Sequence, residues 1–160
     1  MYANIFSLNY LLANTISLLI LVIAVFWPAI ARVLLSLVFM TAAFINAILA
    51  IRDPEIYMVY GRLAALPIYE KFIYGTFHNN IAIIVMSISI CQMVTGIFLL
   101  SGKALLRWGL IAAVVFLAAI APLGAGSAFP STLLLAAAAM VLLFKRKYFS
   151  ADPLVLRHHA

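Results

Sequence analysis

The chain has 160 residues, of which 68% are hydrophobic and 9% are charged, and its formal net charge is +6. Apolar residues make up only about half of an ordinary soluble domain, so this composition, with a mean hydropathy of +1.23, excludes a soluble protein and indicates an integral membrane protein. The basic residues are dispersed, apart from one triplet at 145–147, and this dispersal excludes a nucleic-acid partner.

Charge-free stretches predict the first three membrane spans. A helix rises about 1.5 Å per residue, so a bilayer core of about 30 Å requires about 20 helical residues. Three stretches have this length and contain no Lys, Arg, Asp or Glu: residues 7–27, 33–51 and 81–101. Each is therefore predicted to cross the membrane once.

The apolar stretch 105–144 is too long for a single span. Its middle contains Pro122, Gly124, Gly126 and Pro130, residues that break helices and form turns. We therefore expect two helices around a tight outer turn, at the ranges 105–121 and 130–144. The predicted fold is an all-α, polytopic helical membrane bundle, with five transmembrane helices in a single membrane domain covering residues 1–160.

Positive charge predicts the orientation of this bundle, because cytoplasmic loops carry an excess of Lys and Arg. If the amino terminus lies outside, the three outer basic residues are Arg52, Arg62 and Lys71. The cytoplasmic set is larger and comprises Arg32, Lys103, Arg107, Lys145, Arg146, Lys147 and Arg157. We therefore expect a multi-pass protein of a cytoplasmic (inner) membrane, with the amino terminus outside and the carboxyl terminus in the cytoplasm.

The basic triplet begins a predicted cytoplasmic tail, residues 145–160. Lys145, Arg146 and Lys147 follow the shortest span directly, so their side chains are expected to reach toward the headgroups. A basic residue near an anionic membrane surface gains about 1 kcal/mol. Phospholipid headgroups are the expected partners of this triplet.

The outer segment 52–80 lies between the second and third spans and is the longest connection. Asp53 and Pro54 predict a helix start, with the Asp53 carboxylate as the cap and proline at the first helical position. Apolar residues then recur at helical spacing: Ile56, Val59, Tyr60, Leu63 and Leu66. This pattern predicts an amphipathic lid along the membrane surface, continued by a second piece at 68–74.

Two interpretations of the lid remain open. Its tyrosines fit the interfacial belt of a membrane protein, which makes it a surface-lying segment with aromatic anchors. Alternatively, it closes over a hydrophobic ligand such as a quinone or a lipid, whose polar end contacts a charged or titratable side chain. The candidates for that contact are Arg62, Glu70, Lys71 and His78.

Neutral polar residues inside the spans are explained by hydrogen bonds between helices, each worth about 0.6 to 2 kcal/mol. They include Asn14, Thr15, Thr41, Asn46, Ser87, Ser89, Gln92 and Thr95. Gln92 and Asn46 also suit ligand binding, because an amide can bind a carbonyl such as a quinone head. With His78 and Tyr74 from the lid, they form the candidate site for a quinone or lipid. The single Cys91, in the middle of a span, is expected to behave as a small hydrophobe.

The chain carries no sequence motif for self-contained catalysis, and no metal-ligand cluster is expected. A haem requires axial ligands at membrane depth, and His78 is the only histidine near a predicted span, so haem is disfavoured. The sequence therefore favours a protein that is not itself an enzyme.

The order of features resembles the DoxX-like family of small membrane proteins. Arg32 opens a span that ends at Arg52, a long outer segment follows, and a glycine-punctuated stretch at 92–102 precedes two closely spaced spans. The likeness covers about residues 31–147 and leaves the first span as an added helix. Where the family often has a glutamate and a lysine, this chain has Gln92 and Asn46, respectively.

Members of the DoxX-like family act as membrane partners of other proteins, and this resemblance implies the same role here. We therefore expect an accessory or scaffold subunit of a larger membrane complex, acting by helix-to-helix docking with other membrane protein subunits. One alternative is a quinone-linked oxidoreductase subunit, in which Gln92 or Asn46 holds the quinone beneath the lid. Another is a lipid-binding or assembly-chaperone protein.

Overall fold

A computed structural model describes residues 8–145 of the protein, and this part of the chain is largely helical and contains no strand. Five long helices form the bundle: α1 (Leu8–Phe26), α2 (Pro28–Arg52), α5 (Ile81–Leu100), α6 (Lys103–Ile120) and α7 (Ser131–Phe144). The predicted all-α bundle is confirmed. Short helical turns make up the two longer connections, η1 (Pro54–Met58), α3 (Val59–Leu63), α4 (Pro67–Phe72), η2 (Ile73–Phe77), η3 (His78–Asn80) and η4 (Ala121–Ser127).

The lengths of these helices fit a bilayer. Four stretches of the described chain are long and apolar enough to cross one: Leu8–Phe26, Pro28–Arg52, Pro67–Leu100 and Ala104–Ala125. The remaining helix, α7, has 14 residues, which corresponds to about 21 Å and is shorter than the hydrocarbon core. The chain is a helical membrane protein.

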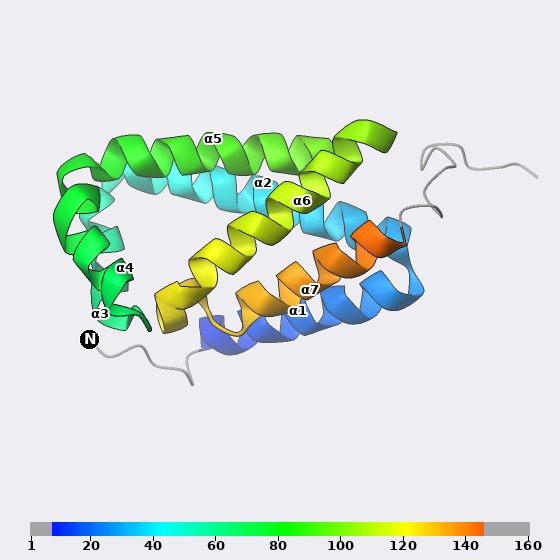
Figure 1. Ribbon diagram of the computed structural model, residues 1–160, viewed down its shortest axis with the longest axis horizontal. Helices are drawn as coiled ribbons and strands as arrows, with labels where there is room; N and C mark the ends of the chain where they lie inside the picture. Colours follow the sequence, from blue (N-terminus) through cyan, green and yellow to red (C-terminus); the bar gives the residue numbers. More distant parts are fainter. Residues whose placement is uncertain (1–7, 146–160) are drawn as a thin grey trace, which may run out of the picture.

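The helices form two pairs joined by a diagonal helix. Figure 1 shows α2 beside α5 and α1 beside α7, while α6 crosses between the two pairs. The lid, residues 53–80, covers one end of the bundle, together with η4 and the start of α1. We call this the lid end; the short α1–α2 and α5–α6 connections lie at the opposite end.

Turn residues set the boundaries of the helices. Trp27 alone separates α1 from α2, because Pro28 cannot continue the first helix but suits the first position of the next. Gly124 has a φ of +64° and reverses the chain between α6 and α7. The predicted break in the stretch 105–144 therefore occurs where the proline and glycine residues indicated.

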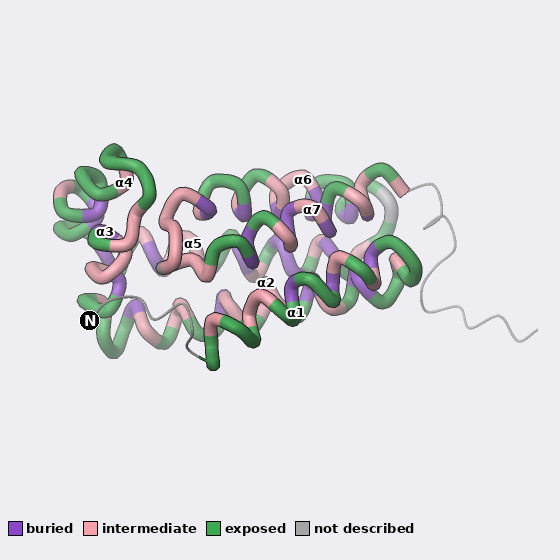
Figure 2. The backbone as a smooth tube through the Cα atoms, turned by 90° about the horizontal axis from the view of Figure 1, so that it is seen from below, coloured by how far each residue is buried: buried purple, intermediate pink, exposed green. Residues whose placement is uncertain are grey.

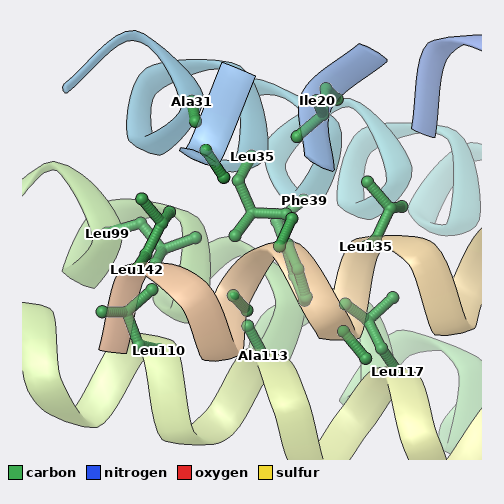
Figure 3. Packing of buried hydrophobic residues seen from close by; sticks show 14 of the residues in the cluster. Ile20, Ala31, Leu35, Phe39, Leu99, Leu110, Ala113, Leu117, Leu135 and Leu142 are labelled. Carbon is green, nitrogen blue, oxygen red and sulfur yellow. The ribbon is translucent and has the colours of Figure 1, made fainter. Parts of the chain in front are cut away.

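The main core lies where the five long helices meet. Ile20, Leu35, Leu99, Leu110 and Leu142 each come from a different long helix and pack together, as Figure 3 shows. Figure 2 shows exposed residues on the outward faces of the helices and buried residues between them. Because the exposed side chains include many Leu, Ile and Val residues, the outer faces of the long helices suit contact with lipid.

Small residues allow close helix approach in this core. A Cβ atom at Gly96 of α5 would lie 2.6 Å from Met40 Cγ and 3.2 Å from the Ser36 carbonyl oxygen, both in α2. Ser36 Oγ also donates a hydrogen bond of 2.7 Å to the Gly96 carbonyl. The α2–α5 pair is therefore held by backbone proximity as well as by apolar packing.

One expectation about charge is wrong. Arg32 was expected in a loop, but the structure places it inside α2 with only 3% of its surface exposed. Its Nε donates to the carbonyl of Leu99, and its Nη2 donates to that of Ser101 at 2.7 Å. The last carbonyls of a helix lack partners within it and carry partial negative charge, which explains why a guanidinium can be buried there.

Two details of the lid also differ from the expectation. Asp53 precedes the first turn of the lid, with Pro54 at the first helical position, but the Asp53 side chain makes no capping hydrogen bond. In the first part of the lid, residues 53–66, the buried positions are Tyr57 and Gly61, whereas Ile56 and Leu66 are each 46% exposed. The first turn is a tighter 3₁₀ helix, which rotates the side chains away from the α-helical pattern.

Candidate functional site

A chain of hydrogen bonds joins three elements near the lid end. The hydroxyl of Tyr57 in η1 donates to Asn46 Oδ1 of α2 at 2.8 Å, and Asn46 Nδ2 donates to Gln92 Oε1 of α5 at 2.8 Å. We call these three residues the polar relay. Two of the residues proposed from the sequence, Asn46 and Gln92, are therefore in direct contact.

The chain reversal after α2 brings Tyr57 to this position. The first turn of the lid begins at Pro54, two residues after the end of α2, and folds Tyr57 back toward the bundle interior. The Tyr57 ring packs against the rings of Tyr60 and Phe77, with centroids 5.8 Å and 6.5 Å away. This aromatic contact holds the hydroxyl in reach of Asn46.

Burial makes the tyrosines of the site weaker acids than an exposed tyrosine. Desolvation raises the pKa of Tyr57 to about 12, with a smaller contribution from the nearby Tyr60 hydroxyl. Burial likewise raises the pKa of Tyr60 above its usual value of 10.0. Both hydroxyls therefore keep their protons through the neutral range, and Tyr57 remains a hydrogen-bond donor there.

The polar relay borders a cavity of about 150 Å³ between α2, α5, α6 and the lid. A cavity of about this volume holds one benzene-sized ring. Its lining residues are Asn46, Tyr57, Tyr60, Phe77, Val85, Ile88, Gln92, Phe116, Ile120, Leu123 and Ser127. This lining contains no charged side chain, so the cavity suits a neutral group.

The relay presents hydrogen-bond donors to the cavity. Both amide oxygens already accept, Asn46 Oδ1 from Tyr57 and Gln92 Oε1 from Asn46. Within residues 8–145, the structure records no acceptor for Gln92 Nε2, although Gln92 is only 5% exposed. A carbonyl oxygen in the cavity would supply that acceptor.

Backbone contacts hold the lid over this end of the bundle. The amide of Ala65 donates to the Pro122 carbonyl at 2.8 Å, and the Tyr69 hydroxyl donates to the Ala119 carbonyl at 2.7 Å. Gly124 lies so close to the lid that a Cβ atom there would approach the Leu63 carbonyl oxygen to 2.4 Å. The lid is therefore attached to the α6–α7 connection.

The other proposed site residues lie away from the cavity. His78 is half exposed, and its Nε2 is 3.9 Å from Glu55 Oε2. Tyr74 is 44% exposed and packs its ring on Gly61. The remaining charged candidates of the lid, Arg62, Glu70 and Lys71, are exposed.

The basic triplet is described only in part. Lys145 Nζ donates to the Val25 carbonyl at 2.5 Å, near the last turn of α1. Arg146 and Lys147 lie outside the described residues. Within the described range, Lys145 therefore contacts a helix end at the opposite end of the bundle.

Most polar side chains of the spans pair across or within helices. Ser89 Oγ donates to the Ala43 carbonyl, and the hydroxyls of Ser17 and Ser131 are 2.7 Å apart. The Cys91 side chain is exposed on α5. These contacts distinguish the relay, which borders a cavity, from polar groups that serve helix packing.

Tyr57 is the site residue that the sequence did not single out. The sequence placed it with the other lid tyrosines in an interfacial belt, and its periodicity did not mark it as buried. The short spacing between the end of α2 and Tyr57 is the one signal that indicated a position near Asn46.

In the described part of the chain, no group of three His, Cys, Asp or Glu side chains could hold a metal ion.

Comparison with protein-family models, with curated proteins and with solved structures finds no match for this chain. The cavity and the polar relay are therefore the features of the molecule that bear on its function.

Proposed function

We propose that this protein is a membrane subunit that binds the headgroup of a quinone-class lipid in the cavity at the lid end. The observation that carries the proposal is the polar relay, which offers N–H donors to a cavity whose remaining walls are largely apolar and aromatic. Ligand sites in proteins commonly combine apolar walls with a few placed polar groups.

The dimensions and charge of the cavity favour a quinone head over other membrane ligands. A single six-membered ring fits a volume of about 150 Å³. A phospholipid headgroup carries a phosphate, which requires cationic partners, and no Lys or Arg lines this cavity. A quinone head is a single uncharged ring with carbonyl oxygens, so it fits the cavity volume and needs no cationic partner.

A second candidate function, helix docking within a larger complex, is supported by a groove between α1 and α2. The groove has a volume of about 550 Å³ and is open on the outer face of the bundle. Its lining is apolar except for Thr41, and comprises Ile16, Leu19, Ile20, Ile23, Leu34, Leu37, Val38, Thr41, Ala42 and Ile45. An apolar span of a partner subunit is a suitable occupant, and the two functions are compatible.

We also propose membership of the DoxX-like family and a cytoplasmic-membrane location with the amino terminus outside. Arg52, Arg62 and Lys71 lie at or near the lid end, whereas Arg107 and Lys145 lie toward the opposite end. This distribution supports an outer lid, because positive residues favour the cytoplasmic side.

Replacing Gln92 with leucine is expected to weaken binding of duroquinone, a tetramethyl benzoquinone, by about tenfold. Loss of one neutral hydrogen bond costs about 1 to 1.5 kcal/mol, and about 1.4 kcal/mol corresponds to a factor of ten. Equilibrium binding to the protein in lipid nanodiscs, corrected with empty nanodiscs, measures the effect.

The matched control for this experiment is Ser87→Ala, on the same helix. Ser87 is exposed and bonds only to the Ile83 carbonyl of its own helix, so duroquinone affinity should be unchanged. Absence of duroquinone binding to the unaltered protein would contradict the proposed function, as would equal affinities of the Gln92→Leu and Ser87→Ala variants.

Labelling of introduced cysteines tests the proposed orientation. Glu70→Cys in the lid should react with a membrane-impermeant maleimide in intact cells, and Gly102→Cys only after permeabilisation. Glu70 is exposed, and a Cβ atom at Gly102 would meet nothing within 4 Å, so neither change disturbs packing. The reverse labelling pattern would show that the lid faces the cytoplasm.

A further inference from the structure

We infer that the cavity discriminates between the redox states of its ligand, holding the oxidised carbonyl form more tightly than the reduced hydroxyl form. This inference rests on the proposed function, because it concerns the same ligand class in the same cavity. It depends on the direction of the hydrogen bonds in the polar relay.

The relay runs in one direction from the lid to the cavity. Tyr57 donates to Asn46, and Asn46 donates to Gln92, so each amide oxygen is used as an acceptor. What remains for the ligand is the Nε2 group of Gln92, which can only donate. A quinone carbonyl accepts this hydrogen bond, whereas a quinol hydroxyl that donates to the relay must share an amide oxygen that already accepts one hydrogen bond.

Reversal of the relay would leave a buried group unpaired. For a quinol to donate to Gln92, the amides of both Gln92 and Asn46 must turn over, and Tyr57 must then accept from Asn46. Its hydroxyl proton would need a new acceptor, and within residues 8–145 Asn46 is the only acceptor recorded for Tyr57. Burial of an unpaired hydroxyl is costly, so the observed direction is favoured.

The other polar groups of the cavity lining are two hydroxyls. Tyr60 and Ser127 are hydroxyls, which can donate or accept. Ser127 Oγ already donates to the Gly124 carbonyl at 3.0 Å. These hydroxyls can accept from a quinol, whereas the Nε2 group of Gln92 can only donate, so the preference for the quinone is attributed to the Gln92 amide.

The test compares duroquinone with durohydroquinone, each titrated under argon into the protein in nanodiscs at pH 8.5. Duroquinone is expected to bind about tenfold more tightly. For a couple that takes up two electrons and two protons, this ratio lowers the midpoint potential of the bound form by about 30 mV relative to the free form. Equal affinities, or tighter binding of durohydroquinone, would overturn the inference.

Asn46→Asp provides a variant with nearly the same shape and opposite hydrogen-bond character. The ionised carboxylate can only accept, so it takes hydrogen bonds from both Tyr57 and Gln92. Gln92 must then present Oε1 to the cavity, and the preference is expected to shift toward durohydroquinone by at least tenfold. Retention of the original preference in folded Asn46→Asp protein, with the carboxylate shown to be ionised by infrared spectroscopy, would overturn the inference.

Two further measurements keep the outcomes distinct. If Asn46→Asp fails to fold by gel filtration, or if its carboxyl stays neutral, Tyr57→Phe replaces it, because removal of the terminal donor should bring the affinity ratio close to one. An unchanged ratio in Tyr57→Phe would overturn the inference. Absence of duroquinone binding to the unaltered protein would instead overturn the proposed function.

Discussion

Replacing Arg32 with methionine is expected to lower the free energy of unfolding by about 3 kcal/mol, since a hydrogen bond to a charged group contributes about 1.5 to 3 kcal/mol. Arg32 is buried in α2 and donates to the carbonyls of Leu99 and Ser101 at the end of α5. Without the guanidinium, these carbonyls lose a donor in a setting that excludes most water. Thermal unfolding in detergent, followed by circular dichroism, measures the loss.

Arg107→Met is the control for this change. Arg107 lies in the first turns of α6, near the same end of the bundle, and its side chain is exposed. Its replacement should leave the melting temperature close to that of the unaltered protein. Equal melting temperatures of the Arg32→Met and Arg107→Met variants would show that the buried arginine does not join α2 to the end of α5.

Replacing Gly124 with alanine is expected to destabilise the lid end by about 2 kcal/mol or more, because a non-glycine residue in a strained backbone region costs about 1 to 3 kcal/mol. Its φ is +64°, and the added Cβ would lie 2.4 Å from the Leu63 carbonyl oxygen. That oxygen belongs to the backbone, so the lid must move away. Faster hydrogen exchange across the lid measures the detachment, and duroquinone affinity should fall with it.

Gly102→Ala separates this steric effect from a general effect of removing glycine. A Cβ atom there would meet nothing within 4 Å, and the φ of Gly102 is −75°. We expect Gly102→Ala to leave exchange in the lid unchanged. Unchanged exchange in Gly124→Ala as well would mean that the α6–α7 connection does not hold the lid.

The long helices could be predicted from the sequence because they depend on local properties. A charge-free stretch of about 20 residues must satisfy its backbone within a helix when it crosses a bilayer. The break between α6 and α7 was equally local, since Pro122 and Gly124 mark it directly. Predicted and observed ends of the helices agree within a few residues, apart from the start of α2.

The predicted start of α2 was wrong because the position of Arg32 depends on its contacts with another helix. A sequence pattern treats Arg32 as a boundary, since a lone charge is unfavourable in hydrocarbon. In the fold, the partners of Arg32 are carbonyls 67 and 69 residues away along the chain. A local sequence pattern does not reveal a contact between residues so far apart along the chain, so the sequence could not place Arg32 inside the helix.

The site could be predicted in part for a similar reason. Asn46 and Gln92 were conspicuous as amides inside apolar spans, and the structure pairs them. Tyr57 was hidden among four lid tyrosines, because its inward direction depends on the tight turn after α2 and on contacts with Phe77. His78 and Tyr74 were conspicuous by residue type, but the fold places them on the outer side of the lid.

Native mass spectrometry of the protein, extracted gently from its own membrane, is the most direct test of quinone binding. We expect one bound molecule with the mass of a quinone per chain, and loss of that molecule in Gln92→Leu but not in Ser87→Ala. A chain that carries no quinone, or that carries equal amounts with and without the Gln92 amide, would show that the cavity is not a quinone site.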